Sequence, residues 1–229
     1  MEIDIERNIK KYRRGVNPTE RYASFDYCFN YFQAFRERDC ISEVSDLKNI
    51  QESCLQLGFY LASWGMMRGS TVLIRKSAKY LQPLIELIAS LDGEVWAIDV
   101  DNYSKDNINT LLECRGKIKK ALQKHHLPTD STPTDVLITK IMLGVFGNVP
   151  AFDTFFCKGF SIRVLDIQSL QIIGEFYHQH QEEIEQHRNR IFTLDFMTEK
   201  PTHRYYTRAK IIDMVGFIEG IRKSRKTKP

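Results

Sequence analysis

The spacing of apolar residues constrains the fold of this chain more than any other feature. Between residues 47 and 64 they recur at steps of three and four, which places them on one face of a helix beginning near Ser45. They are Leu47, Ile50, Cys54, Leu57, Leu61 and Trp64. An aromatic stripe precedes them, behind a helix start at Asn17 and Pro18, and we expect it to pack into the core. Its members are Tyr22, Phe25, Phe29 and Phe32.

The same helical spacing recurs along the rest of the chain. The expected helices cover 70–88 with a break or kink at Pro83, 108–122, 134–147, 154–158, 167–184 and a last one after Thr207. Residues 95–100 are the most strand-like stretch, but they are few and run into a polar loop. We therefore predict an all-α, single-domain multi-helix bundle of about eight helices. Its parts are a basic lead-in at 1–16, a helical domain at 17–222 and a basic tail at 223–229.

Composition places the chain among ordinary globular proteins. Apolar residues make up 42% and charged residues 27% of its 229 residues, which argues against a disordered chain. No apolar run has the length of a membrane span, and the acidic start, Met1 to Asp4, is not a secretory signal. The five cysteines form no C-x-x-C pair, which favours reduced thiols over disulfides or a cysteine zinc site. We expect a cytoplasmic protein with no metal, no cofactor and no membrane partner.

Basic residues are clustered, although the net charge of +4 is mild. The clusters cover residues 10–14, 117–124 and 222–226. Such clusters suit a polyanion, and DNA is the partner that we expect. Four lysines of the middle cluster are candidate phosphate contacts: Lys117, Lys119, Lys120 and Lys124. The alternative is that these lysine runs are ordinary solvated surface.

The densest motif lies in the second half of the chain. Lys140, Gly144 and Gly147 share one face of the expected helix, and the glycines leave room for nucleic acid to approach the backbone beside an amine. The chain turns at Pro150, and Asp153 stands where the next helix begins. We therefore expect a lysine and a carboxylate to converge on one cleft. The structural alternative is that Gly147 only ends a helix, Gly144 only lets helices pack and Asp153 only caps.

Residues 139–155 read T-K-I-M-L-G-V-F-G-N-V-P-A-F-D-T-F. This segment resembles the core of the helix-hairpin-helix DNA glycosylase superfamily, which includes the 8-oxoguanine and endonuclease III types. In lyase-type members a lysine attacks the sugar, and an aspartate in a V-D-T type segment supports attack at the sugar carbon. The resemblance implies these roles for Lys140 and Asp153. Residues 210–214, K-I-I-D-M, are similar to the closing helix of some glycosylase-like proteins.

The chain departs from that family at three points. The family's L-P-G-V-G type hairpin, which binds DNA phosphate through backbone amides, is replaced by P-T-D-V-L at residues 133–137. Lys140 and Asp153 are thirteen residues apart, which is shorter than usual in the family. No cysteine cluster for an iron–sulfur centre is present.

These observations lead to a functional prediction and its rivals. We expect a DNA-acting protein, a glycosylase or glycosylase/lyase that excises a damaged or modified base, with Lys140 and Asp153 as catalytic residues. The base would be flipped into a pocket lined by Trp64, Met66 and Arg68. The alternative is a non-catalytic nucleic-acid-binding or protein-interaction module on a glycosylase-like scaffold. A third reading is an accessory factor in bacterial defence against mobile DNA, acting through protein contacts.

Overall fold

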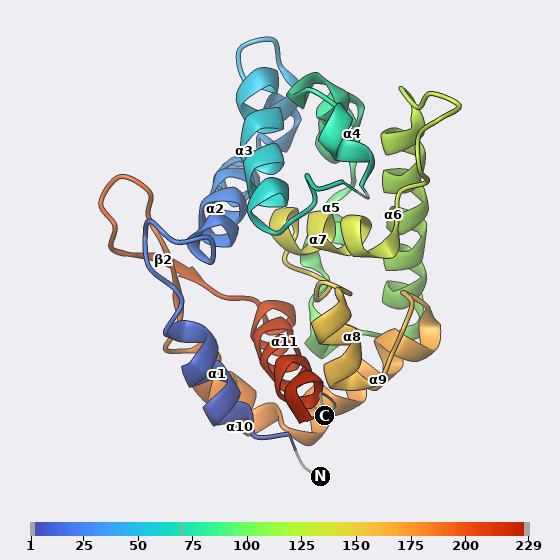
Figure 1. The fold of residues 1–229 in the computed structure, drawn as a ribbon. Helices are drawn as coiled ribbons and strands as arrows, with labels where there is room; N and C mark the ends of the chain where they lie inside the picture. The colour runs from blue at the N-terminus through green and yellow to red at the C-terminus, as the bar shows by residue number, and fades with distance from the viewer. Residues whose placement is uncertain (1–2, 70, 227–229) are drawn as a thin grey trace.

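The computed structural model describes residues 3–69 and 71–226, and this part of the chain is mostly helical (Figure 1). Met1, Glu2, Ser70 and the last three residues of the predicted basic tail lie outside it. The eleven α-helices of the described residues are α1 (Ile5–Arg13), α2 (Ala23–Glu37), α3 (Ile50–Ser63), α4 (Gln82–Ser90), α5 (Gly93–Ala97), α6 (Lys105–Gln123), α7 (Asp135–Val145), α8 (Thr154–Phe160), α9 (Ile167–Gln179), α10 (Gln181–Arg188) and α11 (Arg208–Lys226). The all-α class predicted from the apolar spacing is therefore confirmed.

Shorter elements complete the fold. Turns of 3-10 helix lie at Ile41–Ser45, Val72–Arg75, Ala78–Leu81 and Val100–Asn102. The strands β1 (Phe192–Leu194) and β2 (Pro201–Tyr205) pair as one antiparallel hairpin, which the sequence did not lead us to expect. None of the described helices combines the length and the apolar character that a membrane crossing requires.

The predicted basic lead-in is largely the helix α1. Asp4 caps this helix by accepting a backbone hydrogen bond from its first turn. Ile5, Ile9 and Tyr12 are buried, and α1 packs against α11. Three apolar residues at helical spacing therefore outweigh the lysines and arginines between them, and α1 belongs to the helical body of the protein.

Two predicted helix starts lie too early in the chain. α2 begins at Ala23 and not at Asn17, because residues 17–23 form successive turns with backbone bonds three residues apart. α3 begins at Ile50 and not near Ser45, and Leu47 in the intervening turn is 98% exposed. The other members of both predicted stripes pack in or against the core, as expected.

Residues 71–102 depart most from the predicted elements. Two 3-10 turns replace the first part of the helix expected from Ser70. Pro83 lies in the first turn of α4, where its missing N–H costs no hydrogen bond, so it starts a helix and does not split one. The strand-like residues 95–100 form part of α5 and a following turn, because Val95 and Trp96 find a buried place on a short helix.

The region after α8 is also divided differently from the prediction. The long helix expected over residues 167–184 is two helices, α9 and α10, which meet at His180. The β-hairpin that follows is tethered to α2. Leu194 N donates to Asp26 Oδ2 at 2.9 Å, and Asn30 Nδ2 donates to Leu194 O at 2.8 Å. Since these partners lie far apart in the sequence, no local pattern indicates the hairpin.

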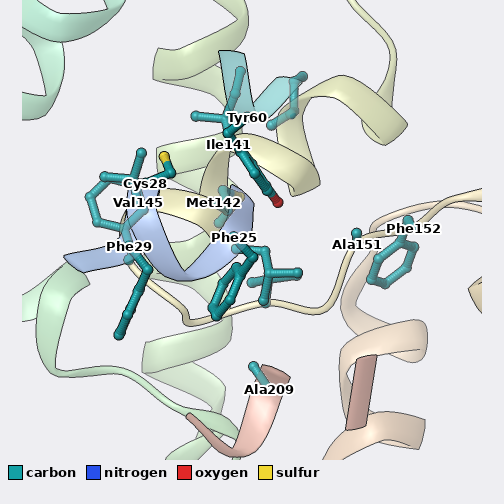
Figure 2. Packing of buried hydrophobic residues seen from close by; sticks show 14 of the residues in the cluster. Phe25, Cys28, Phe29, Tyr60, Ile141, Met142, Val145, Ala151, Phe152 and Ala209 are labelled. Atoms are coloured by element: carbon teal, nitrogen blue, oxygen red, sulfur yellow. The ribbon is translucent and has the colours of Figure 1, made fainter. Parts of the chain in front are cut away.

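α7 runs through the middle of the molecule (Figure 1). Every residue of α7 from Leu137 to Val145 is buried. Figure 2 shows Ile141, Met142 and Val145 packed among side chains of other elements, including Phe25 and Tyr60. A helix buried on all sides leaves no solvent for a charged side chain, so Lys140 has to find its partners inside the protein.

α8 and α11 lie side by side in close backbone contact (Figure 1). A Cβ atom added at Gly159 would overlap the carbonyl of Gly216, and one added at Gly220 would overlap the carbonyl of Phe155. Only glycine permits this approach. The contact places the N-terminus of α8, where Asp153 stands, beside the buried side of α11.

Candidate functional site

Lys140 lies at the centre of the candidate site. Its side chain is 4% exposed, and its amine donates to Asp153 Oδ2 at 3.4 Å. The amine also lies 5.0 Å from the ring centroid of Trp64. Burial lowers the pKa of Lys140 from its usual value of 10.5, against the opposing effects of Asp153 and Asp213. Desolvation therefore increases the fraction of this amine that is neutral.

Asp153 divides its two carboxylate oxygens between two roles. Oδ1 caps α8 by accepting from Phe155 N and Phe156 N, both at 3.0 Å. Oδ2 faces Lys140, and the side chain keeps 18% of its exposure. The sequence left open whether this aspartate is a cap or lies in a cleft. The structure places it in both positions at once.

The segment that carries Asp153 is held from two sides. Thr139 Oγ1 on α7 accepts from Phe152 N at 2.9 Å, and Asp213 Oδ1 on α11 accepts from Ala151 N at 3.1 Å. These two backbone amides lie directly before Asp153 in the chain. The distance between Lys140 and Asp153 is therefore set by contacts from both helices.

A second lysine–aspartate pair lies behind the first. The Lys210 amine donates to Asp213 Oδ2 and to the Tyr12 hydroxyl, both at 2.9 Å. It lies 5.5 Å from the ring centroid of Trp64 and 4.5 Å from that of Phe25. A void of about 10 Å³, room for about one water molecule, separates the two pairs.

This second pair was not predicted from the sequence. Lys210 and Asp213 lie in the stretch that is similar to a closing helix, and Tyr12 lies in the predicted lead-in. The available signal was a lysine and an aspartate three residues apart in residues 209–218, whose other members are apolar or glycine. Such a pair in an apolar helix indicates a buried ion pair.

The first pair borders a pocket of about 460 Å³. Its lining includes all five residues predicted for catalysis and for the base pocket: Trp64, Met66, Arg68, Lys140 and Asp153. Phe155 and Phe217 add two aromatic walls, and Arg21 and Ser63 line both this pocket and a neighbouring groove of about 710 Å³. The structure therefore brings these predicted residues together around one space large enough for a planar ring system.

The predicted nucleic-acid contacts do not join this pocket. Tyr60 covers Gly144, while Thr207 and Phe29 cover Gly147, so the protein itself occupies the space beside both glycines. The prediction that nucleic acid approaches the backbone there is wrong, and the structural alternative for both glycines holds. Gly147 ends α7 with a φ of +70°.

The four predicted phosphate-binding lysines lie on α6 and its C-terminal cap. They are Lys117, Lys119, Lys120 and Lys124. The C-terminal end of α3 borders the pocket. α7 lies between α3 and α6 (Figure 1). Within the described residues, none of these lysines is part of the pocket lining.

Neither a metal-binding cluster in the described residues nor a similar known protein indicates a function for this site. Among the described residues, no group of three or more His, Cys, Asp or Glu side chains is arranged to hold a metal ion. The described site consists of a desolvated amine, a carboxylate and aromatic walls around one pocket. No protein-family model, no curated protein and no solved structure matched the chain.

Proposed function

We propose that this protein acts on DNA as a glycosylase/lyase that excises a damaged or modified base. One observation carries the proposal. The buried Lys140 amine has a lowered pKa, lies 3.4 Å from Asp153 Oδ2, and borders a pocket with aromatic walls together with that carboxylate. A desolvated amine beside a carboxylate is the pair that covalent catalysis at a sugar carbon requires. The resemblance of residues 139–155 to the glycosylase core supports the same roles.

The pocket suits an extruded base. A base rotated out of the duplex needs flat apolar surfaces to replace its stacking partners, and Trp64, Phe155 and Phe217 supply them. Asp153 keeps one oxygen for the reacting centre because the other already caps α8. As the bond to the base lengthens, positive charge grows on the sugar, and the carboxylate stabilises that charge.

The reaction begins with the neutral form of Lys140. The lone pair of the amine forms a bond to C1′ while the bond from C1′ to the base breaks, with its electron pair moving to the base. One proton of the amine passes to the departing base through Asp153. Opening of the sugar ring then gives an imine at C1′, with the second amine proton on the ring oxygen. Loss of the C2′ proton from this imine expels the 3′-phosphate and breaks the strand, which is the lyase step. Water then hydrolyses the imine, which leaves an aldehyde at C1′ and restores the amine.

Borohydride trapping tests the proposal. Borohydride reduces the imine to a stable amine, so the protein becomes linked to the DNA. We expect adducts with at least one member of a panel of duplexes that each carry a damaged or modified base. Lys140→Gln should give none, and Asp153→Asn should release base about 10²- to 10³-fold more slowly.

Lys105→Gln is the matched control, since Lys105 is an exposed lysine of α6 outside both the pocket lining and the predicted phosphate contacts. It should behave like the unmodified protein. If no duplex yields abasic sites or adducts, or if Lys140→Gln still forms adducts, the enzymatic proposal is wrong. DNA binding without base release would instead favour the non-catalytic binding module.

A further inference from the structure

Two exposed arginines, Arg21 and Arg68, lie at the pocket. Neither forms an ion pair within the described residues. Other arginines of the protein are paired, for example Arg204 with Glu37 and Arg208 with Glu185. Unpaired guanidinium groups keep their full capacity to bind an anion.

The positions of both guanidinium groups are defined by the pocket wall. The guanidinium carbon of Arg21 lies 5.3 Å from the ring centroid of Tyr22 and 5.4 Å from that of Trp64. Arg68 folds back over Gly65, because a Cβ atom added at Gly65 would lie 3.8 Å from Arg68 Nη1. Gly65 and Trp64 both line the pocket, so both guanidinium groups lie against its wall.

The charge of the pocket favours an anionic ligand. Its charged lining consists of Arg21, Arg68, Lys140 and Asp153. Lys140 and Asp153 face each other, so their charges largely cancel. The remaining positive charge belongs to the two arginines. A ligand that matches this pocket therefore combines a planar ring for the aromatic walls with an anionic group for the arginines.

We infer that Arg21 and Arg68 bind the backbone phosphate of the nucleotide whose base enters the pocket. This inference rests on the proposed function, and it specifies the substrate as a nucleotide within a DNA strand. It places this phosphate contact at the pocket, apart from the contacts predicted for the α6 lysines. Arginine suits this role because its planar guanidinium offers two parallel N–H groups to two phosphate oxygens.

A binding experiment without chemistry tests the inference. The probe is a labelled duplex with one tetrahydrofuran abasic-site analogue, which has no base to release. Its affinity is measured by fluorescence anisotropy from about 50 to about 200 mM salt. The variant is Arg21→Gln with Arg68→Gln. The control is Arg75→Gln with Arg163→Gln, because these two exposed arginines lie outside the pocket lining and the net charge changes equally.

The pocket variant should bind the duplex about 10- to 100-fold more weakly than the unmodified protein at about 100 mM salt. The slope of log affinity against log salt should fall in magnitude by about 1, because the two arginines share one phosphate. The control should change both quantities much less. Equal losses in the two double variants, or no loss in the pocket variant, would overturn the inference.

Two further arms separate the possible failures. A deoxynucleoside monophosphate as competitor tests the source of the phosphate. If the arginines govern its binding but not that of the duplex, the ligand is a free nucleotide and the strand assignment is wrong. The base-release assay on the unmodified protein is the second arm. Arginine-dependent binding in a protein that releases no base would support the phosphate site and overturn only the proposed catalysis.

Discussion

Two lysine–aspartate pairs place their lysine amines near the ring of Trp64. The two amines differ in how many hydrogen bonds they donate and how short those bonds are. The Lys210 amine donates at 2.9 Å both to Asp213 and to the Tyr12 hydroxyl. The Lys140 amine has one oxygen partner among the described residues, Asp153, at 3.4 Å. An ammonium group has three protons to donate, so Lys210 is the better satisfied of the two. The same two residue types therefore have different hydrogen bonding in the two pairs.

The exposure of the two carboxylates follows the same division. The Asp213 side chain is 9% exposed, and its second oxygen is used by Ala151 N within the core. The Asp153 side chain is 18% exposed and borders the pocket. We conclude that the Lys210 pair joins α1 to α11 as part of the structure. The Lys140 pair borders the pocket, where the proposed function requires an amine and a carboxylate.

Replacing each lysine in turn should give the largest change in stability, and the size of the change should differ between the two pairs. Lys210→Met leaves Asp213 buried with its charge uncompensated and the Tyr12 hydroxyl without its partner. We expect a loss of about 3–5 kcal/mol in the free energy of unfolding. Lys140→Met should cost about 1 kcal/mol, because Asp153 retains two backbone N–H donors and part of its exposure. Urea denaturation of both variants measures the difference.

Methionine is the matched replacement in both variants because it keeps an unbranched apolar chain of similar length. An unchanged denaturant slope in each variant would show that the unfolding transitions are comparable. Equal losses of stability would contradict the division between a structural pair and a pocket pair. A larger loss for Lys140→Met would reverse it.

Local sequence signals predicted the helices around the pocket pair because their ends are determined by neighbouring residues. Thr134 and Asp153 accept hydrogen bonds from the first turns of α7 and α8. Thr207 Oγ1 accepts from Lys210 N in the first turn of α11. These caps need only a side chain and the next three residues, so a single sequence reveals them.

The structural pair was not predictable in the same way. Tyr12 and Lys210 meet although they are 198 residues apart. The β-hairpin has the same origin, since its Leu194 amide and carbonyl bond to Asp26 and Asn30 on α2. The packing beside Gly144 and Gly147 was not predictable either. The side chains that fill the space beside these glycines come from distant parts of the sequence.

The two oxygens of Asp153 give a second, smaller test of the pocket pair. Asparagine caps a helix about as well as aspartate, so Asp153→Asn should keep the bonds to the α8 amides and remove the charge that faces Lys140. Alanine removes both. We expect Asp153→Ala to lose about 1 kcal/mol of unfolding free energy and Asp153→Asn clearly less. Thermal unfolding of the two variants in parallel measures the effect. Equal losses in the two variants would mean that the cap contributes nothing.

The pH dependence of stability gives the smallest effect. Burial lowers the folded-state pKa of Lys140 below its usual value of 10.5. Between those two values the unfolded chain binds more protons than the folded protein, so the free energy of unfolding should rise with pH. Lys140→Met should lack this contribution.

Buried thiols act in the opposite direction in that range, since burial raises the pKa of Cys54 to about 11 and that of Cys114 to about 12. A thiol that keeps its proton longer in the folded state lowers stability as pH rises. The curve for the unmodified protein minus the curve for Lys140→Met cancels these contributions. The difference should slope upward toward pH 10.5, by less than about 1.4 kcal/mol per pH unit, the limit for a single group. A flat or falling difference would mean that the pKa of Lys140 is not lowered in the folded protein, and burial would then not favour the neutral nucleophile.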